Sequence, residues 1–311
     1  MPLTRSTEHV EWRASGGVEF SQKNMRALGG SLRLVEGTRM EISGAPATAL
    51  VAIQNQEVSL QADRFIWEDD RFHPTGKPVL RTAASLLGLA GEDLQVSAQR
   101  MGFDFETQEW ELLGNISLRG GATGYAEKIL GDPQGIEFFP GSRSNCMLAG
   151  TLEGGREIEL HADSIRLEQN KTIHLQGSAS TAIAQEGDRP LKLTGRQGLL
   201  SASGGWFKNH VELKSEDLRG ASQHVLWEFS PEGQLLLRME GPDSQLSNAQ
   251  FKAKAQKIIY DKQHQTLDLT GTATQTSLLE VDGGKRISGD NIQFDFTNHL
   301  LSGTNMEVRI P

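Results

Sequence analysis

The feature of this sequence that most constrains its fold is a phrase that recurs about every 33 residues. Each copy begins with a small residue, continues with an apolar-x-aromatic pair and an aspartate, and after a polar turn ends in an apolar strand closed by glycine. The clearest copies are AQKIIYDKQHQTLDLTG (255–271) and GDNIQFDFTNHLLSG (289–303). The small residue stands at positions 29, 62, 98, 126, 162, 195, 221, 255 and 289. A fixed period of this length is typical of repeat architectures, so we expect about nine stacked units of roughly 33 residues.

Within each copy, apolar and polar residues alternate with a period of two, which is the pattern of a half-buried strand. The segments between the apolar runs, such as DKQHQ at 261–265, are short and polar, which favours hairpins and antiparallel pairing. Apolar residues at helical spacing occur in 81–94, but Gly88 and Gly91 limit that segment to one or two turns. The sequence therefore predicts an all-β protein built from stacked antiparallel strands.

The small residue at the start of each copy and the glycine at its end both indicate bends. A strand that bends sharply or passes close to a neighbour has room there for a methyl group at most, and glycine can also supply a positive φ. The glycines concerned are Gly76, Gly114, Gly177, Gly271 and Gly303. If all strands bend at one level, the stack becomes a bent, open-sided β-jellyroll (a β-taco) whose apolar faces line the inside.

Composition and motifs argue against several classes of function. Thirty-one basic residues against 40 acidic ones give a net charge of −9, unlike a nucleic-acid binder. The single cysteine, Cys146, excludes an internal disulfide and a cysteine-rich zinc site. The sequence has no apolar run near 18 residues, no apolar signal core in its first 17 residues, and no phosphate-loop or nucleophile-elbow motif.

Scattered polar residues do not assemble into a catalytic or metal-binding pattern. The eight histidines form no i, i+4 pair. His161 and Asp163 could share a strand face, but a metal needs three or four converging ligands, so we interpret them as a solvated pair. Asp104, Asp261 and Asp295 recur in register, which favours turn formation over catalysis. We expect no catalytic residues, no bound metal, no cofactor and no enzymatic activity.

The repeated phrase resembles the periplasmic lipopolysaccharide-transport bridge family (the LptA/LptC, OstA-like group). The best matches are 255–271 and 287–303, and weaker copies extend the resemblance over about 27–311. The resemblance implies a periplasmic protein whose signal or membrane anchor is not present in this sequence. It also implies that lipopolysaccharide or a similar amphiphile places its acyl chains in a hydrophobic groove, and that protomers or related β-jellyrolls stack end to end.

Nine units exceed what the resemblance implies for one bridge protomer, so the chain is expected to be either one long jellyroll or two in tandem. We assign 1–26 to an N-terminal lead-in and 27–125 to a first part of the jellyroll. Residues 126–157 form a glycine-rich, degraded repeat and a possible boundary, and 158–311 form a second part.

The interior groove is expected to be lined by the apolar residues that alternate within the copies. These are Phe65, Trp67, Met101, Phe103, Phe105, Ile165, Leu167, Ile258, Tyr260, Ile292 and Phe294. In the last unit, Met306, Val308 and Ile310 alternate to the end of the chain. We expect them to form an unpaired strand edge that a partner of the same shape extends by β-augmentation.

Two functions of different classes fit these observations. The first is a periplasmic bridge that binds lipopolysaccharide, holds its acyl chains in the groove and passes it toward the outer membrane. The second is a structural or carbohydrate-active β-solenoid of the cell envelope, whose strands would be parallel. A scaffolding protein with a filled core is a third, weaker possibility. The tight polar turns favour antiparallel strands and thus the first hypothesis.

Overall fold

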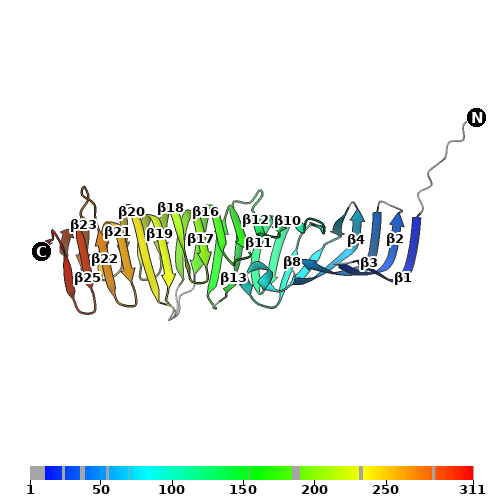
Figure 1. The fold of residues 1–311 in the computed structure, drawn as a ribbon, viewed down its shortest axis with the longest axis horizontal. Helices are drawn as coiled ribbons and strands as arrows, with labels where there is room; N and C mark the ends of the chain where they lie inside the picture. The colour runs from blue at the N-terminus through cyan, green and yellow to red at the C-terminus, as the bar shows by residue number, and fades with distance from the viewer. Residues whose placement is uncertain are drawn as a thin grey trace, which may run out of the picture. The chain divides into compact units, whose positions relative to one another are not determined.

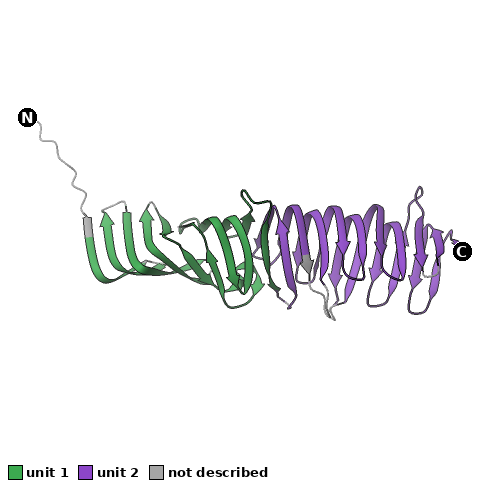
Figure 2. Cartoon of the chain, turned by 180° about the vertical axis from the view of Figure 1, so that it is seen from behind, with its two compact units in different colours: residues 1–151 green, residues 152–311 purple. Residues whose placement is uncertain are grey.

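A computed structural model of the chain consists almost entirely of antiparallel β-strands, which confirms the predicted all-β class and the bent jellyroll (Figure 1). The described residues are 11–22, 25–35, 39–53, 56–68, 70–153, 155–183, 190–230, 234–281 and 284–310. They fall into two compact units, unit 1 within residues 1–151 and unit 2 within residues 152–311 (Figure 2). The boundary lies within the glycine-rich segment 126–157, and the finer division drawn from the sequence stays a prediction.

Unit 1 begins with four long strands and continues with shorter ones that pair with one half of a longer neighbour. Its strands are β1 (Glu11–Gln22), β2 (Met25–Val35), β3 (Arg39–Ile53), β4 (Gln56–Glu68), β5 (Arg71–Thr75), β6 (Val79–Thr82), β7 (Leu89–Ala90), β8 (Leu94–Ser97), β9 (Arg100–Asp104), β10 (Glu109–Gly120), β11 (Ala122–Asp132), β12 (Gly135–Phe139) and β13 (Cys146–Leu152), the last crossing the unit boundary. A 3-10 helix at Ala84–Leu87 confirms that 81–94 supports no more than a turn or two of helix. Strand β1 falls inside the lead-in assigned to 1–26, so strand structure begins before residue 27; residues 1–10 lie outside the described part.

Unit 2 repeats the same plan with greater regularity. Its strands are β14 (Glu157–Ala162), β15 (Ser164–Glu168), β16 (Ile173–Ile183), β17 (Leu191–Ser201), β18 (Gly204–Lys214), β19 (Arg219–Phe229), β20 (Leu235–Ser247), β21 (Phe251–Asp261), β22 (Thr266–Thr270), β23 (Ser277–Val281), β24 (Lys285–Gly289), β25 (Asn291–Asp295), β26 (Leu300–Thr304) and β27 (Glu307–Arg309). Each long strand bends once, so the unit has two arms. We call arm A the side that holds β15, β22, β25 and β26, and arm B the side that holds β14, β23, β24 and β27.

The bends coincide with breaks in strand register. In β16 to β21 the pairing shifts once per ladder, for example between Gln176 and Ala179 and between Glu240 and Ser244. At two of these corners the small residue of the repeated phrase lies on the inside, where Ala162 and Ala255 are fully buried. At β19, Ala221 is exposed and Ser222 is the buried residue instead. Opposite Ala162, Gly177 has φ +86°, and a Cβ there would collide with the Asp163 carboxylate. The structure thus supports the steric explanation at Ala162, Ala255 and Gly177.

Of the five glycines expected at bends, Gly271 and Gly303 are required by close approach of the backbone and not by a positive φ. Gly76 and Gly114 have positive φ, as Gly177 does, but Gly271 and Gly303 do not. At Gly271 a Cβ would overlap the Gln275 carbonyl oxygen and stand 3.1 Å from the Ser277 nitrogen. Close approach of backbone excludes a side chain at this corner, and no positive φ is involved.

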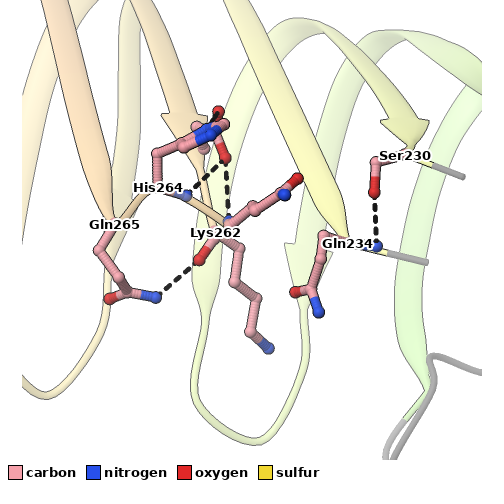
Figure 3. A network of polar contacts seen from close by, with 7 residues as sticks. Ser230, Gln234, Lys262, His264 and Gln265 are labelled. Carbon is pink, nitrogen blue, oxygen red and sulfur yellow. Dashed lines mark hydrogen bonds and ion pairs between the residues drawn. The ribbon is translucent and has the colours of Figure 1, made fainter. Parts of the chain in front are cut away.

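Three of the described hairpin turns are stabilised in the same way, by an aspartate at the end of the preceding strand. Asp261 Oδ1 accepts hydrogen bonds from the backbone N–H groups of Gln263 and His264, at 2.9 and 3.1 Å. Gln265 closes the same turn by donating from Nε2 to the Lys262 carbonyl oxygen (Figure 3). Asp104 and Asp295 make the same pair of bonds in their turns. The turn-forming role predicted for these three aspartates is confirmed.

These hydrogen bonds also account for the charge state of the turn aspartates. The backbone N–H of Thr107 holds the pKa of Asp104 below its usual range, and the backbone N–H of Asn298 does the same to the pKa of Asp295. A carboxylate with a depressed pKa stabilises the fold above the pKa of the unfolded chain and loses that contribution as the pH falls through the folded pKa. Acid therefore weakens these turns.

We predict that Asp261→Ala lowers the free energy of unfolding by about 1–2 kcal/mol, because two backbone N–H groups lose their acceptor. Asp261→Asn keeps an oxygen in the same place and is expected to cost much less. Urea unfolding followed by circular dichroism measures both. Equal destabilisation by the two variants would contradict the turn role.

Candidate lipid-binding interior

The inward faces of the two arms of unit 2 carry continuous rows of apolar side chains. One row on arm A crosses neighbouring strands in direct register through Trp227, Leu237, Tyr260, Leu267 and Phe294. A second row, nearer the bend, runs through Val225, Met239, Ile258, Leu269 and Ile292. Nearly all of these side chains are buried between the arms. The residues that the sequence assigned to a groove are thus parts of longer rows.

Most of the predicted groove residues point into the interior. Those that are buried are Phe65, Met101, Phe103, Ile165, Leu167, Ile258, Tyr260 and Ile292. Trp67, Phe105 and Phe294 are only half-buried. Phe105 lies one residue beyond the end of β9, inside the turn that Asp104 stabilises. The apolar alternation that predicted an inward position for Phe105 applies only within the strand, which ends before this residue. Whether any of these residues contacts lipid stays a prediction.

In unit 1 the predicted residues meet around one that the sequence analysis missed. The Phe72 ring on β5 lies 5.2 Å from Phe65 and 6.1 Å from Phe103, centroid to centroid. Trp67 stacks on Phe105 at 5.3 Å, and both rings also contact Phe72. Phe72 lies between Arg71 and His73 in a short strand, so no run of alternating apolar residues marked it as an inward residue.

In unit 2 a second aromatic group joins the two arms. Phe251, at the start of β21 in arm B, lies 5.7 Å from Tyr260 and 5.1 Å from Phe296, both in arm A. Phe296 also contacts Phe294 at 4.7 Å. Phe251 and Phe296 were not predicted from the sequence, since their proximity to each other depends on the fold-back of β21. The residue after the turn aspartate is aromatic at both Phe105 and Phe296, and this repetition could have indicated a shared position.

Large side chains of the protein fill parts of the interior. Phe207 and Trp227 stack at 5.9 Å and both are fully buried, although they come from weaker copies of the repeat. In unit 1, a space of about 10 Å³ remains where Ile53 faces Phe103 and Trp110. That space is at the lower limit for a single water molecule. At these two places an acyl chain would need the arms to separate or the side chains to rearrange.

The outer faces of the described strands carry mainly polar side chains. A concavity of about 330 Å³ on unit 1 is lined by side chains that include Arg71, His73, Asp104 and Glu111 around Gly102. His161 bonds Glu159 at 2.7 Å instead of forming a pair with Asp163. Within the described residues, no three histidine, cysteine or carboxylate side chains converge as metal ligands would. A helix with the length and hydropathy to cross a membrane is likewise not found there.

The last strands of unit 2 leave apolar side chains and strand edges exposed. Strand β27 pairs with β24, and β26 pairs with β25; no further partner is found for either strand among the described residues. Met306, Val308 and Ile310 are 37%, 49% and 73% exposed. Leu300 on β26 is 64% exposed. The structure places the three predicted edge residues at an unprotected sheet end, and their contact with a partner stays a prediction.

Comparison with known proteins identifies one family. Residues 155–299 match the family described as LptA/(LptD N-terminal domain) LPS transport protein. The match lies within unit 2 and confirms the resemblance to lipopolysaccharide-transport proteins that the repeated phrase indicated. A search of curated proteins returned no match.

We predict that Phe103→Ala lowers the free energy of unfolding by about 3–5 kcal/mol, the usual cost of removing a buried aromatic ring. Phe105→Ala is expected to cost less than half as much, since Phe105 is half-buried beside a turn. Urea denaturation of the two variants compares them directly. If Phe105→Ala were the more damaging change, the placement of Phe105 at the turn would be wrong.

Proposed function

We propose that the chain binds lipopolysaccharide in the periplasm and passes it toward the outer membrane, because residues 155–299 match a family of lipopolysaccharide-transport proteins. The observation that carries this proposal is the pair of inward apolar faces in the segment that matches the family. Acyl chains would lie between the arms of unit 2, against the rows that include Ile258, Tyr260 and Phe294. The predicted role of these residues as a lipid-binding surface is retained on this basis.

The energetics of acyl-chain burial favour such a site. Each buried methylene contributes roughly 0.8 kcal/mol, so several acyl chains supply a large driving force without a specific contact to the sugar. Part of this gain is offset by the contacts between the arms that the lipid would displace. A closed interior that opens for its ligand also keeps its apolar surface away from water while empty.

Charge on the outside of the molecule suits a lipid whose phosphorylated sugars remain in solvent. The chain has a net charge of −9. Lysines on the outer face of unit 2 are paired with acids on neighbouring strands: Lys252 with Glu280 at 3.6 Å and Lys257 with Glu240 at 3.2 Å. These two lysines are engaged by carboxylates, and the proposal rests on recognition of the acyl chains.

Transfer between proteins would use the exposed end of unit 2. The edges of β26 and β27 present backbone donors and acceptors that a strand from another copy or a related jellyroll could pair with. Val308 pairs with the buried Ile287, so its side chain faces the interior side of the sheet. A partner added here would extend the apolar interior past the end of the chain.

The alternative of a carbohydrate-active β-solenoid receives no support from the structure. A β-helix of that kind has parallel strands, whereas all ladders between described strands are antiparallel. The family matched by residues 155–299 is one of transport proteins. We therefore retain the transport function alone.

We predict that a photoactivatable phenylalanine analogue at Tyr260 crosslinks to purified lipopolysaccharide, because Tyr260 lies in the inward row. The same analogue at Ile259, the adjacent residue on the opposite face, is the matched control and is expected to capture little. Gel mobility and mass spectrometry of the irradiated protein report the adduct. Capture at Ile259 without capture at Tyr260 would place the lipid on the outer face and refute the proposed site.

We predict that Val308→Lys combined with Ile310→Lys weakens end-to-end association at least tenfold, because lysine at a sheet edge disfavours strand addition. Leu278→Lys is the control, since Leu278 is exposed on β23, a strand paired on both sides. Analytical ultracentrifugation over a concentration series measures self-association, and pull-downs test related jellyroll partners. A second route is to place prolines at Glu307 and Arg309. Unchanged association in both sets would show that this edge is not the interface.

A further inference from the structure

The hairpin turns of arm A and arm B in unit 2 meet along the side opposite the bends, which we call the mouth. Arm A contributes the turns 169–172, 201–203, 262–265 and 296–299, and arm B contributes 215–218, 248–250 and the residues just before β14. Because each arm is held together by its own strand ladders, a contact between these two sets of turns joins the arms directly. Among the described residues of unit 2, four groups of such contacts are found.

An arginine from arm B reaches across the mouth near the start of unit 2. Arg156 precedes β14, and its Nη1 donates a hydrogen bond to the Ala202 carbonyl oxygen at 2.7 Å. Its guanidinium also lies 4.2 Å from the centroid of the Phe229 ring. Ala202 and Phe229 both belong to the arm A side, in the turn after β17 and at the end of β19. One exposed side chain thus holds two strands of the opposite arm.

Two ion pairs cross the mouth on either side of this arginine. Lys171, in the turn after β15, pairs with Glu153 at 2.5 Å. Lys262, in the turn after β21, pairs with Asp217 at 3.6 Å. The Ser215 hydroxyl and the Lys262 ammonium hold the pKa of Asp217 below its usual range, so this carboxylate is charged at neutral pH. Figure 3 shows the Lys262 side chain extending away from the hydrogen bonds that fix its turn.

The aromatic group of Phe251, Tyr260 and Phe296 closes the mouth at the next level. Phe251 belongs to arm B, and its two ring contacts are to arm A. Both Phe251 and Tyr260 are buried, so the same rings form part of the interior and part of its closure. Other ion pairs of unit 2, such as Lys257 with Glu240, join neighbouring strands of one arm and do not cross the mouth.

We propose that these contacts form a latch that holds the mouth of unit 2 closed when it is empty, and that an amphiphile opens the latch as its acyl chains enter. The opening step rests on the proposed function, whereas the closed latch does not. When an acyl chain lies between the arms, the sugar of the same lipid remains outside. The covalent connection between acyl chain and sugar then has to pass through the mouth. The contacts therefore break where the lipid sits and can re-form behind it.

The strengths of the contacts suit a reversible latch. The paired side chains of Glu153, Lys171 and Asp217 are well exposed, and exposed ion pairs are individually weak and screened by salt. Several weak contacts in a row keep the mouth closed together, yet each can be released without disturbing the strand ladders. The latch is expected to loosen as the salt concentration rises.

Distances between spin labels across the mouth test the latch without any lipid. Labels on cysteines at Lys214 in arm B and Gln263 in arm A occupy exposed positions on opposite sides, while the native Cys146 is buried. Arg156→Ala combined with Lys262→Ala is expected to shift the distance distribution to longer values and broaden it. Lys252→Ala combined with Lys257→Ala, which breaks ion pairs within the arms, is the matched control and is expected to leave it unchanged. Circular dichroism confirms that all variants are folded.

An unchanged distribution in the Arg156 and Lys262 variant would overturn the latch, as would equal broadening in the control. A second arm of the experiment adds purified lipopolysaccharide to the labelled protein that retains Arg156 and Lys262, with a photocrosslinker at Tyr260. Capture of lipid together with a longer distance supports the opening step. Capture without any change in distance overturns it and leaves the proposed function intact. If no lipid is captured at Tyr260, the proposed function fails, and the lipid-free distances still decide whether the latch exists.

Discussion

A β-strand that folds back on itself leaves no room for a side chain on the inside of the bend, and the rest of this protein depends on that steric limit. Alanine or glycine stands at most corners of unit 2, and the opposing strand bends at the same level. The corner of β18 is the exception, since Asn209 and His210 adopt positive φ there. Ala162 faces the corner of Gly177, where a methyl group would already collide with Asp163. Because successive strands bend together, their apolar faces are enclosed between two arms and the polar faces point outward.

The same bend sets the limit of what the sequence alone could predict. Alternation identified Ile258 and Tyr260 correctly as inward residues, and the repeated aspartates were correctly assigned to turns. The phase of the alternation slips at each corner, however, because one strand of every pair carries extra residues there. Phe251 therefore has no fixed relation in the sequence to Tyr260, and its position on the opposite arm could be known only once the fold-back of β21 was seen.

Weak copies of the repeat concealed some of the largest buried side chains. In the copy that contains Trp227, His224 stands where the clear copies have an apolar residue. Trp227 nevertheless occupies the same inward row as Tyr260. Phe105 lies beyond the end of β9 and is half-buried, since the alternation continues in the sequence after the strand has ended. The exposed partners across the mouth, such as Arg156 and Ala202, are 46 residues apart and carry no sequence signal of their proximity.

The aspartate turns have a consequence for how the molecule can fold and change. The hairpins that end in Asp104, Asp261 and Asp295 contain their own turn bonds. In a stack where each hairpin contacts chiefly the hairpins beside it, stability is approximately a sum over units and their nearest neighbours. Folding can begin at any well-formed hairpin and spread in both directions. A damaged hairpin frays its neighbours but leaves distant ones in place, and whole hairpins can be gained or lost without redesigning the rest. Length in such a molecule is a variable that evolution can adjust one hairpin at a time.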